Sequence, residues 1–289
     1  MARVFKDVKN VLGTFVTITV IHPRPDEAAD ALSASFKEIQ RIHNLMSANQ
    51  QESEVGILNK MGCHKGVSPD TACVVQRAND FSERSEGAFD ITVLPLVELW
   101  KENALQGKVP SEEAINRTLE LVDYKKVVME NNSIEFLKTG MSITLAGIAK
   151  GYAVDRAILT LKERKIRHAL VNAGGDIRAL GGKTETLPWK AAIRDPRGNN
   201  RIVAMVDLFD QAIATSGAYL RPFNDILNPK SGRPVQEIIS STVIAENAMD
   251  ADILATCMIT LGAGKGIEWL GGLRETRAFI IKSDGEVLN

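Results

Sequence analysis

The sequence predicts a compact α+β fold in which a mixed, largely antiparallel sheet is packed by helices. Two observations lead to this class. Strand-like and helix-like segments occur throughout the 289 residues, yet they do not alternate strictly as they would in a doubly wound sheet. No internal repeat or low-complexity linker divides the chain. We therefore expect a single domain over residues 1–289, which is long enough to bury an ample core.

The first two elements follow from composition and periodicity. Residues 11–21 (VLGTFVTITVI) are rich in β-branched side chains and predict a strand. Residues 26–45 predict a helix, because apolar side chains recur there every three or four positions, as at Phe36 and Ile39.

Three further helices follow. Ser68 and Pro69 open the first of them, since proline is favoured in the first helical turn, and Gly87 ends it. Residues 149–165 and residues 249–261 are the other two predicted helices.

Short strand candidates lie between these helices. They are residues 169–172, 190–194, 202–208, 239–245 and 277–282. Residues 283–286 (SDGE) form a turn signal after the last of them, so Val287 is expected to begin a return strand.

The charge balance excludes some classes of partner. The formal net charge is -1, and acidic and basic residues are interspersed. The chain therefore offers no general attraction to nucleic acid or to an anionic membrane. No apolar run approaches the roughly 20 residues that span a bilayer.

The cysteines and the N-terminus bear on the compartment. Cys63, Cys73 and Cys257 are odd in number and include no close pair, which argues against a disulfide framework or a zinc cluster. Residues 1–10 are polar and charged, unlike a signal peptide. We expect either a cytoplasmic protein or an exported one whose leader was removed.

The helix predicted over residues 249–261 carries the most informative pair. Asp252 and Thr256 are four residues apart, so both side chains project from one face. A carboxylate and a hydroxyl among small or apolar residues can hold a hard cation such as Mg²⁺, which accepts oxygen ligands and needs only one or two carboxylates. The alternative is an amphipathic core helix with a polar first turn.

A second candidate is the entry to the helix at residues 149–165. Small residues lead into it, and its N-terminus offers free N–H groups to an anion. Lys150 supplies a charge suited to a phosphate. Asp155 lies about 140° further around the helix, so it need not face the same ligand. The alternative is a helix entry with a solvated lysine.

Two glycine-containing loops are further candidates. Gly174 and Gly175 allow a ligand to approach the backbone, and Asp176 could hold a ribose hydroxyl or orient the loop. A tight turn is the alternative. Ser216 and Gly217 could bind phosphate or support a turn. Ser216 has no support as a nucleophile, since these motifs contain no histidine.

Taken in chain order, these segments resemble the ApbE family, the FAD:protein FMN transferases. The resemblance covers most of the chain. It is carried by Leu12-Gly13-Thr14, Met46-Ser47, Ser53-Glu54, Leu58-Asn59, Gly87-Ala88-Phe89-Asp90-Ile91-Thr92-Val93, Pro95-Leu96-Val97, Leu99-Trp100, Gly147-Ile148-Ala149-Lys150-Gly151-Tyr152-Ala153-Val154-Asp155, Asn172-Ala173-Gly174-Gly175-Asp176-Ile177, Ile193-Arg194-Asp195-Pro196, Ala214-Thr215-Ser216-Gly217 and Ala251-Asp252-Ile253-Leu254-Ala255-Thr256.

The resemblance implies an activity and a site. Family members cleave the pyrophosphate of FAD with Mg²⁺ and move FMN onto a threonine or serine hydroxyl of an acceptor protein. By resemblance, Asp252, Thr256 and the backbone carbonyl of Gly147 are expected to bind the metal. The expected FAD pocket comprises Met46, Ser47, Asn49, Asp90, Lys150, Asp155, Gly174, Gly175, Asp176, Ser216 and Gly217. Lys150 is also expected to act in catalysis, by stabilising the leaving AMP.

The sequence departs from the family pattern at three positions. Asp225 stands where the family commonly has a histidine, so it is the candidate base, although an unperturbed carboxyl with a pKa of roughly 4 is weakly basic unless burial raises that pKa. Asn49 replaces an aromatic residue, and Thr144 replaces an acidic one. These departures leave two alternatives open, namely a Mg²⁺-dependent FAD pyrophosphatase and a non-catalytic FAD-binding protein.

The resemblance also implies partners and a location. The acceptor would be a flavoprotein subunit of a redox complex, often one bound to a membrane. We expect a periplasmic site, or the outer face of the cytoplasmic membrane, if a leader was removed, and a cytoplasmic site if the chain is complete. The oligomeric state is not predicted.

Overall fold

The computed structural model describes residues 2–198, 201–217, 226–273 and 275–289. Its centre is an eight-stranded sheet in the order β1-β2-β6-β7-β10-β11-β12-β13, with every neighbouring pair antiparallel. The strands are β1 (Arg3–Val11), β2 (Thr14–His22), β6 (His168–Ala173), β7 (Asp176–Leu180), β10 (Ala212–Gly217), β11 (Ile238–Ala245), β12 (Arg277–Lys282) and β13 (Val287–Leu288). The predicted α+β class is confirmed.

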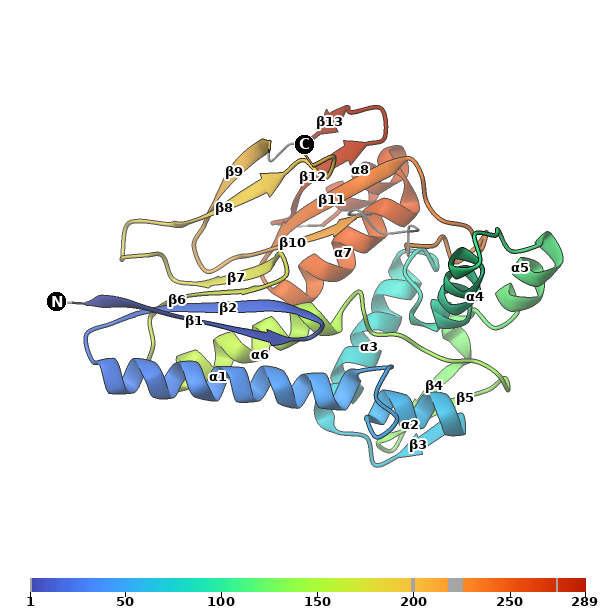
Figure 1. The fold of residues 1–289 in the computed structure, drawn as a ribbon, viewed down its shortest axis with the longest axis horizontal. Helices are drawn as coiled ribbons and strands as arrows, with labels where there is room; N and C mark the ends of the chain where they lie inside the picture. Colours follow the sequence, from blue (N-terminus) through green and yellow to red (C-terminus); the bar gives the residue numbers. More distant parts are fainter. Residues whose placement is uncertain (1, 199–200, 218–225, 274) are drawn as a thin grey trace.

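Helices cover one face of this sheet (Figure 1). They are α1 (Pro25–Met46), α6 (Ala149–Glu163), α7 (Ala248–Leu261) and α8 (Ala263–Gly271). The main core lies in this layer, where Ile39 of α1 and Ile253 of α7 are fully buried with Ile18 and Val171 of the sheet. The sheet alternates its side chains between its two faces, so every second residue of each strand enters this core.

The opposite face is partly covered by a two-stranded hairpin, β8 (Trp189–Arg194) and β9 (Ile202–Leu208). Trp189 and Leu208 of the hairpin form a second core cluster with Ile213 and Ile244 of the main sheet. The central strands are therefore buried on both faces.

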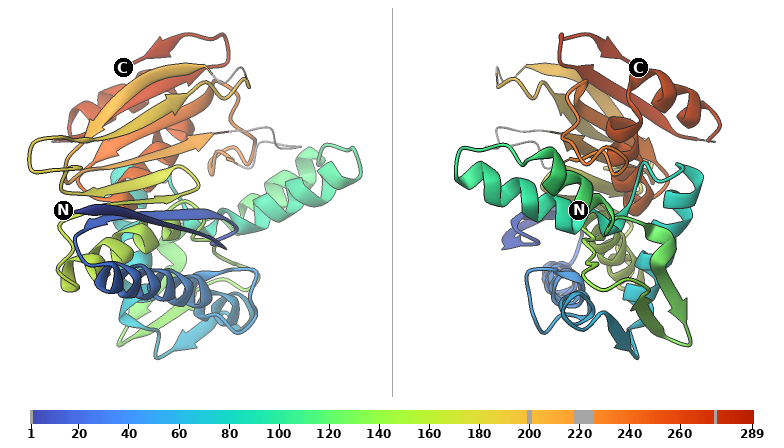
Figure 2. Two further views of the ribbon diagram at one scale, coloured as in Figure 1. Left: turned by 60° about the vertical axis from the view of Figure 1, so that its left-hand side comes forward. Right: turned by 90° about the vertical axis from the view of Figure 1, so that its right-hand side faces the viewer.

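A second group of elements lies beside the sheet at the C-terminal end of α1 (Figure 1). It contains α2 (Glu54–Met61), β3 (Cys63–Lys65), α3 (Pro69–Arg84), η1 (Ile91–Val93), α4 (Leu94–Leu105), α5 (Glu112–Leu119), η2 (Tyr124–Lys126), β4 (Val127–Glu130) and β5 (Ser133–Phe136). Helices α4 and α5 project from the body of the molecule (Figure 2). Within the described residues, no helix combines the length and the apolar character needed to cross a membrane.

The structure contains elements that were not predicted, including α2, α4, α5 and α8, and it also differs from the predicted elements near the N-terminus. The strand expected over residues 11–21 is interrupted, because Leu12 and Gly13 have φ values of 59° and 69° and form the turn between β1 and β2. Strand β1 was not predicted, since its charged side chains mask the alternation. The turn from Leu12 to Thr14 places the start of β2 beside the β6–β7 turn, next to the cavity described below.

Candidate active site

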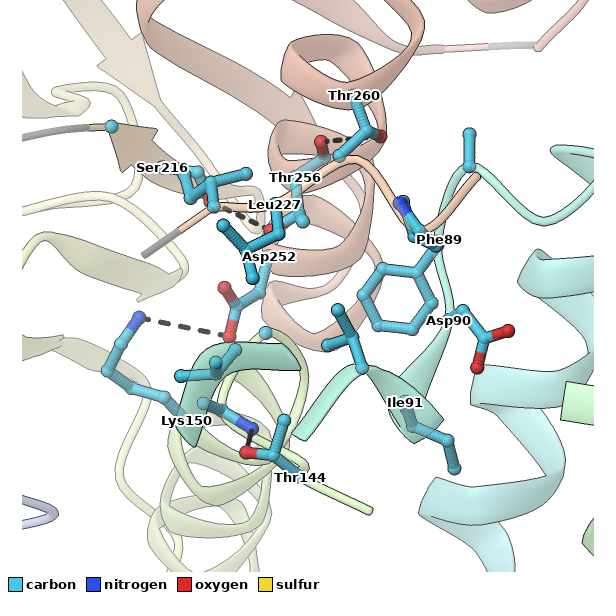
Figure 3. A pocket seen from close by; sticks show the side chains of 18 of the residues that line it. Phe89, Asp90, Ile91, Thr144, Lys150, Ser216, Leu227, Asp252, Thr256 and Thr260 are labelled. Atoms are coloured by element: carbon cyan, nitrogen blue, oxygen red, sulfur yellow. Dashed lines mark hydrogen bonds and ion pairs between the residues drawn. The ribbon is translucent and has the colours of Figure 1, made fainter. Parts of the chain in front are cut away.

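A cavity of about 310 Å³ lies where α6, α7 and the end of β10 meet the segment that contains η1 and α4 (Figure 3). Its walls come from parts of the chain that are far apart in sequence. The lining residues are Ala88, Phe89, Asp90, Ile91, Val93, Val97, Thr144, Ala146, Gly147, Lys150, Gly174, Thr215, Ser216, Gly217, Ile226, Leu227, Pro229, Asp252, Thr256 and Thr260. Volumes of this order are typical of small-molecule sites.

Helix α7 presents two of these side chains from one face. It begins after Asn247, whose side chain accepts a hydrogen bond from the Asp250 amide. Asp252 and Thr256 lie one turn apart further along the helix, and both enter the cavity. The helical spacing predicted this shared face, and the fold turns it toward the cavity.

Asp252 is held at the bottom of the cavity and is only 3% exposed. Its Oδ2 accepts a hydrogen bond of 3.2 Å from the amide of Gly151 in the first turn of α6. Burial raises the pKa of Asp252 from its ordinary value, while Lys150 and the Gly151 amide act to lower it. Gly151 is in the first turn of α6, where amides have no acceptor within the helix, so its N–H is available to Asp252.

Gly147 brings its backbone against Thr256. A Cβ atom at Gly147 would lie 3.4 Å from Thr256 Oγ1 and 3.2 Å from the ring of Phe89. The Phe89 ring would have to shift by a few tenths of an ångström to admit a methyl group, so Gly147 lies close to both Phe89 and Thr256. The structure thus brings together all three predicted metal ligands, Gly147, Asp252 and Thr256.

Lys150 lies on the first turn of α6, near Asp252 (Figure 3), and is close to two carboxylates. Its Nζ forms an ion pair with Asp176 Oδ2 and is 3.8 Å from Asp252 Oδ2. Asp176 is fully buried. Its other oxygen, Oδ1, has no hydrogen-bond partner in the part of the chain that the structure describes. Asp176 does not line the cavity, so its link to the site is its ion pair with Lys150.

The hydroxyl of Ser216, at the end of β10, lies 3.0 Å from Thr256 Oγ1. Gly217 lines the same wall. Gly174 lines the cavity with a φ of +60°, and a Cβ atom there would come within 2.5 Å of Thr14 Oγ1. Its neighbour Gly175 is not in the lining and donates its amide to Asn172 Oδ1 at 3.0 Å.

Asp90 lines the cavity, but its carboxylate points away from Asp252 (Figure 3). Oδ1 accepts hydrogen bonds from the amide and hydroxyl of Thr92, and Oδ2 accepts one from the Tyr124 amide. Burial raises the pKa of Asp90. The side chain therefore fixes the loop that forms this wall rather than facing a ligand in the cavity.

The structure does not bring Asp155 into the cavity lining, where the resemblance led us to expect it. Its carboxylate accepts hydrogen bonds of 2.9 Å from the amides of Ala248 and Met249 at the start of α7, and one of 2.6 Å from Arg178. Asp155 lies on another face of α6 from Lys150 and contributes by fixing the origin of α7.

The segment at the end of α1 is also absent from the cavity lining. Met46 is buried in the main core, Ser47 follows the last turn of the helix, and Asn49 lies in the next turn. Asp225, the candidate base, lies outside the residues that the structure describes.

Several lining residues were not predicted as site residues. Thr260 follows Thr256 by four residues, so the helical period alone would have indicated it. Phe89 belongs to a segment that carried the family resemblance, but nothing in its sequence context marked the ring as a cavity wall. Ile226 and Leu227 follow a stretch without regular periodicity, and only the fold places them there.

No histidine or cysteine lines the described part of the cavity. Within the described ranges, no group of three histidine, cysteine, aspartate or glutamate side chains is placed to hold a metal ion. His22, His43, His64 and His168 are all described, and none of them lines the cavity. Any cation here would depend on one carboxylate, a hydroxyl and backbone oxygen.

Comparison with known proteins shows the family to which this chain belongs. The profile of the ApbE family matches residues 12–280. A relative from Treponema pallidum, named FAD:protein FMN transferase, is 30% identical over 99% of this chain and 86% of its own length. A relative of the same name from Vibrio cholerae is 30% identical over 85% of this chain and 78% of its own.

Two solved structures have the same fold. The ApbE protein from Thermotoga maritima has a TM-score of 0.91 and 31% identity, covering 99% of this chain and 97% of its own. The flavin transferase ApbE from Vibrio cholerae has a TM-score of 0.87 and 27% identity, covering 100% and 97%. The chain belongs to the ApbE family, and the resemblance inferred from the sequence is confirmed.

Proposed function

We propose that this chain is a Mg²⁺-dependent FAD:protein FMN transferase. It would cleave the pyrophosphate of FAD, release AMP and attach FMN to a threonine or serine hydroxyl of an acceptor protein. The observation that carries this proposal is the meeting of Gly147, Lys150, Asp252 and Thr256 around one cavity. The names of the relatives support the choice of FAD and of a protein acceptor.

The donor set of this cavity suits Mg²⁺. A carboxylate, a hydroxyl and a backbone carbonyl are hard oxygen ligands, and Mg²⁺ commonly takes few protein ligands while water and substrate phosphate supply the rest. Gly147 has no side chain and lines the cavity beside Thr256, so the ligand that it can offer a cation is its backbone carbonyl. Asp252 would supply the only carboxylate of the set.

The charges at the site also call for a cation. Lys150 is one positive group beside two carboxylates, Asp176 and Asp252. This cluster alone would repel the negative pyrophosphate of FAD. A bound Mg²⁺ would reverse that balance and withdraw charge from the pyrophosphate oxygens.

The chain's own residues would bind and orient the substrate. Lys150, at the N-terminal turn of α6, would bind an oxygen of the pyrophosphate and stabilise the charge on departing AMP. Ser216 would orient the hydroxyl of Thr256 through their hydrogen bond. The acceptor hydroxyl must lose its proton, and Asp225 is the residue that we assign to that step.

The acceptor that we propose is a flavoprotein subunit of a redox complex. The same site could instead transfer FMN to water and act as an FAD pyrophosphatase. The second reading is favoured by one observation, that no histidine lines the described part of the cavity. Transfer and hydrolysis both release AMP, so they differ in where the FMN goes.

The test is to incubate the protein with FAD and Mg²⁺, with and without an acceptor peptide that presents a Ser/Thr-Gly-Ala loop. Transfer predicts FMN covalently bound to the peptide, seen by its mass and flavin fluorescence. AMP and free FMN in the absence of peptide indicate the pyrophosphatase. FAD binding with neither product would refute both enzymatic readings.

A further inference from the structure

Asp176 and Asp252 compete for one ammonium group. Lys150 Nζ is paired directly with Asp176 Oδ2 and lies 3.8 Å from Asp252 Oδ2. The two carboxylates come from different elements, Asp176 from the start of β7 and Asp252 from α7. Both carboxylates therefore bear on the position of the lysine.

Asp176 has little to bind except Lys150. Its side chain is fully buried, and its Oδ1 has no hydrogen-bond partner among the residues described. A buried carboxylate needs a counter-charge, and removing one partner of such a pair leaves an uncompensated charge. The turn at Gly174 and Gly175 directly precedes Asp176, so the backbone of this turn positions the Asp176 carboxylate beside Lys150.

Release of Lys150 would affect the other carboxylate. The lysine side chain is long and flexible, and Asp252 is a buried acceptor already at the edge of ion-pair distance. A direct pair between Lys150 and Asp252 would occupy the oxygen that a divalent cation needs. Lys150 can thus help to bind a phosphate or hinder the binding of the metal, depending on where it is held.

We propose that Asp176 is a positioning residue that holds Lys150 away from Asp252 and so keeps the Asp252 carboxylate open to a divalent cation. This inference rests on the metal site of the proposed function. It assigns Asp176 to the control of Lys150 and not to direct contact with FAD.

The test measures Mn²⁺ binding to the protein without FAD, by the electron paramagnetic resonance signal of free Mn²⁺. Mn²⁺ prefers the same carboxylate, carbonyl and water oxygens as Mg²⁺. Asp176→Asn should weaken Mn²⁺ binding by about tenfold, because the freed Lys150 competes for Asp252. Combining Asp176→Asn with Lys150→Met removes the competitor and should restore the affinity to within about threefold of the wild type.

A matched control separates this competition from a general loss of packing. Asp195 is also a buried carboxylate with a nearby cation, Arg197, but it lies outside the cavity lining. Asp195→Asn should leave Mn²⁺ binding unchanged. In steady-state assays, Asp176→Asn should raise the Mg²⁺ concentration for half-maximal rate more than the KM for FAD.

Three results would overturn the inference. Unchanged Mn²⁺ affinity in Asp176→Asn would show that Lys150 does not compete. A loss that the Lys150→Met combination fails to restore would assign Asp176 a purely structural role. If the wild type itself binds no Mn²⁺ and cleaves FAD without a divalent cation, the proposed metal site fails, and the inference fails with it.

Discussion

Two buried aspartates at the cavity, Asp252 and Asp90, point in different directions because their hydrogen-bond partners differ. Asp252 accepts one amide, that of Gly151, and its carboxylate faces the cavity near Lys150. Asp90 is saturated by three donors from Thr92 and Tyr124. The first carboxylate therefore has capacity left for a ligand, and the second has a structural role.

Replacement of Asp252 should remove the metal and the activity together. Asp252→Asn keeps the size of the side chain but loses its charge. Since loss of even an outer-shell partner of a metal ligand typically costs 10–100-fold, we expect FAD cleavage and Mn²⁺ affinity to fall by at least about a hundredfold. AMP release and Mn²⁺ titration would measure this.

The control for this variant is Asp207→Asn, which removes a carboxylate on β9 that is paired with Lys190 and is not in the cavity lining. That variant should keep both activity and affinity. Undiminished AMP release by Asp252→Asn would contradict the metal assignment.

Asp90 should make the stability of the protein depend on pH. Burial raises its pKa in the folded protein, so the folded state binds the proton more tightly than the unfolded chain does. Protonated Asp90 stabilises the folded state fully below the ordinary aspartate pKa of about 3.9. This stabilisation is lost as the pH rises through the raised pKa of the folded protein. Asp90→Asn lacks this titration.

The expected outcome is that the unfolding free energy of the wild type, relative to Asp90→Asn, is larger at about pH 4 than at about pH 7. Urea denaturation of both proteins at the two pH values measures this difference. A difference that is constant with pH, or that grows toward neutral pH, would refute the prediction.

At the scale of elements, the site depends on how α6, α7 and the β6–β7 turn begin. Asp155 of α6 accepts two free amides at the start of α7, so one helix sets the starting point of the other. This cap helps fix the turn of α7 on which Asp252 lies. The turn at Gly174 likewise sets where β7 starts, and this places Asp176 beside Lys150.

The β6–β7 turn should tolerate no side chain at Gly174. Gly174→Ala places a methyl group 2.5 Å from Thr14 Oγ1 in a backbone with a φ of +60°. Gly13→Ala is the matched control, since Gly13 has a φ of +69° but no atom within 4 Å of the added Cβ. Both variants incur left-handed backbone strain of about 1–2 kcal/mol.

Only Gly174→Ala has the additional contact with Thr14. We expect it to lose more unfolding free energy than Gly13→Ala by about 1–3 kcal/mol, as overpacking commonly costs. Denaturant melts of the two variants provide the comparison, and equal losses would show that the contact relaxes freely.

At the scale of the whole molecule, the projecting helices α4 and α5 are joined to the cavity wall. Trp100 Nε1 of α4 donates a hydrogen bond of 2.7 Å to the carbonyl of Gly232. Gly232 packs against Ile115 of α5, and its loop continues from the lining residue Leu227. Helices α4 and α5 thereby support one side of the cavity through the loop that contains Gly232.

Trp100→Phe should loosen this wall. Loss of the donor leaves the Gly232 carbonyl unpaired, which costs about 1–3 kcal/mol of unfolding free energy. We expect the KM for FAD to rise severalfold as well. Trp269→Phe is the control, because Trp269 Nε1 donates to the Arg84 carbonyl at 3.0 Å outside the cavity lining. Steady-state kinetics and denaturant melts should give a change in KM only for Trp100→Phe.

Much of the fold was predictable from local pattern. The helices over residues 26–45 and 249–261 were recognised because their side chains repeat with the helical period. Helices α4 and α5 were missed, since each has a single buried residue, Leu96 in α4 and Ile115 in α5. Strand β1 was missed because both its faces carry charges, and Leu12 was read as strand although it forms a turn.

The sequence by itself determined that Asp252 and Thr256 share a helix face and that Gly147 precedes a helix N-terminus, because these depend only on spacing within a few residues. Only the tertiary structure decided that Asp155 caps α7, that Asp176 is buried against Lys150, and that Ser216 meets Thr256. Those pairings join residues that lie 26 to 94 positions apart in the chain. Such contacts are set by how the sheet and helices pack, which no local pattern encodes.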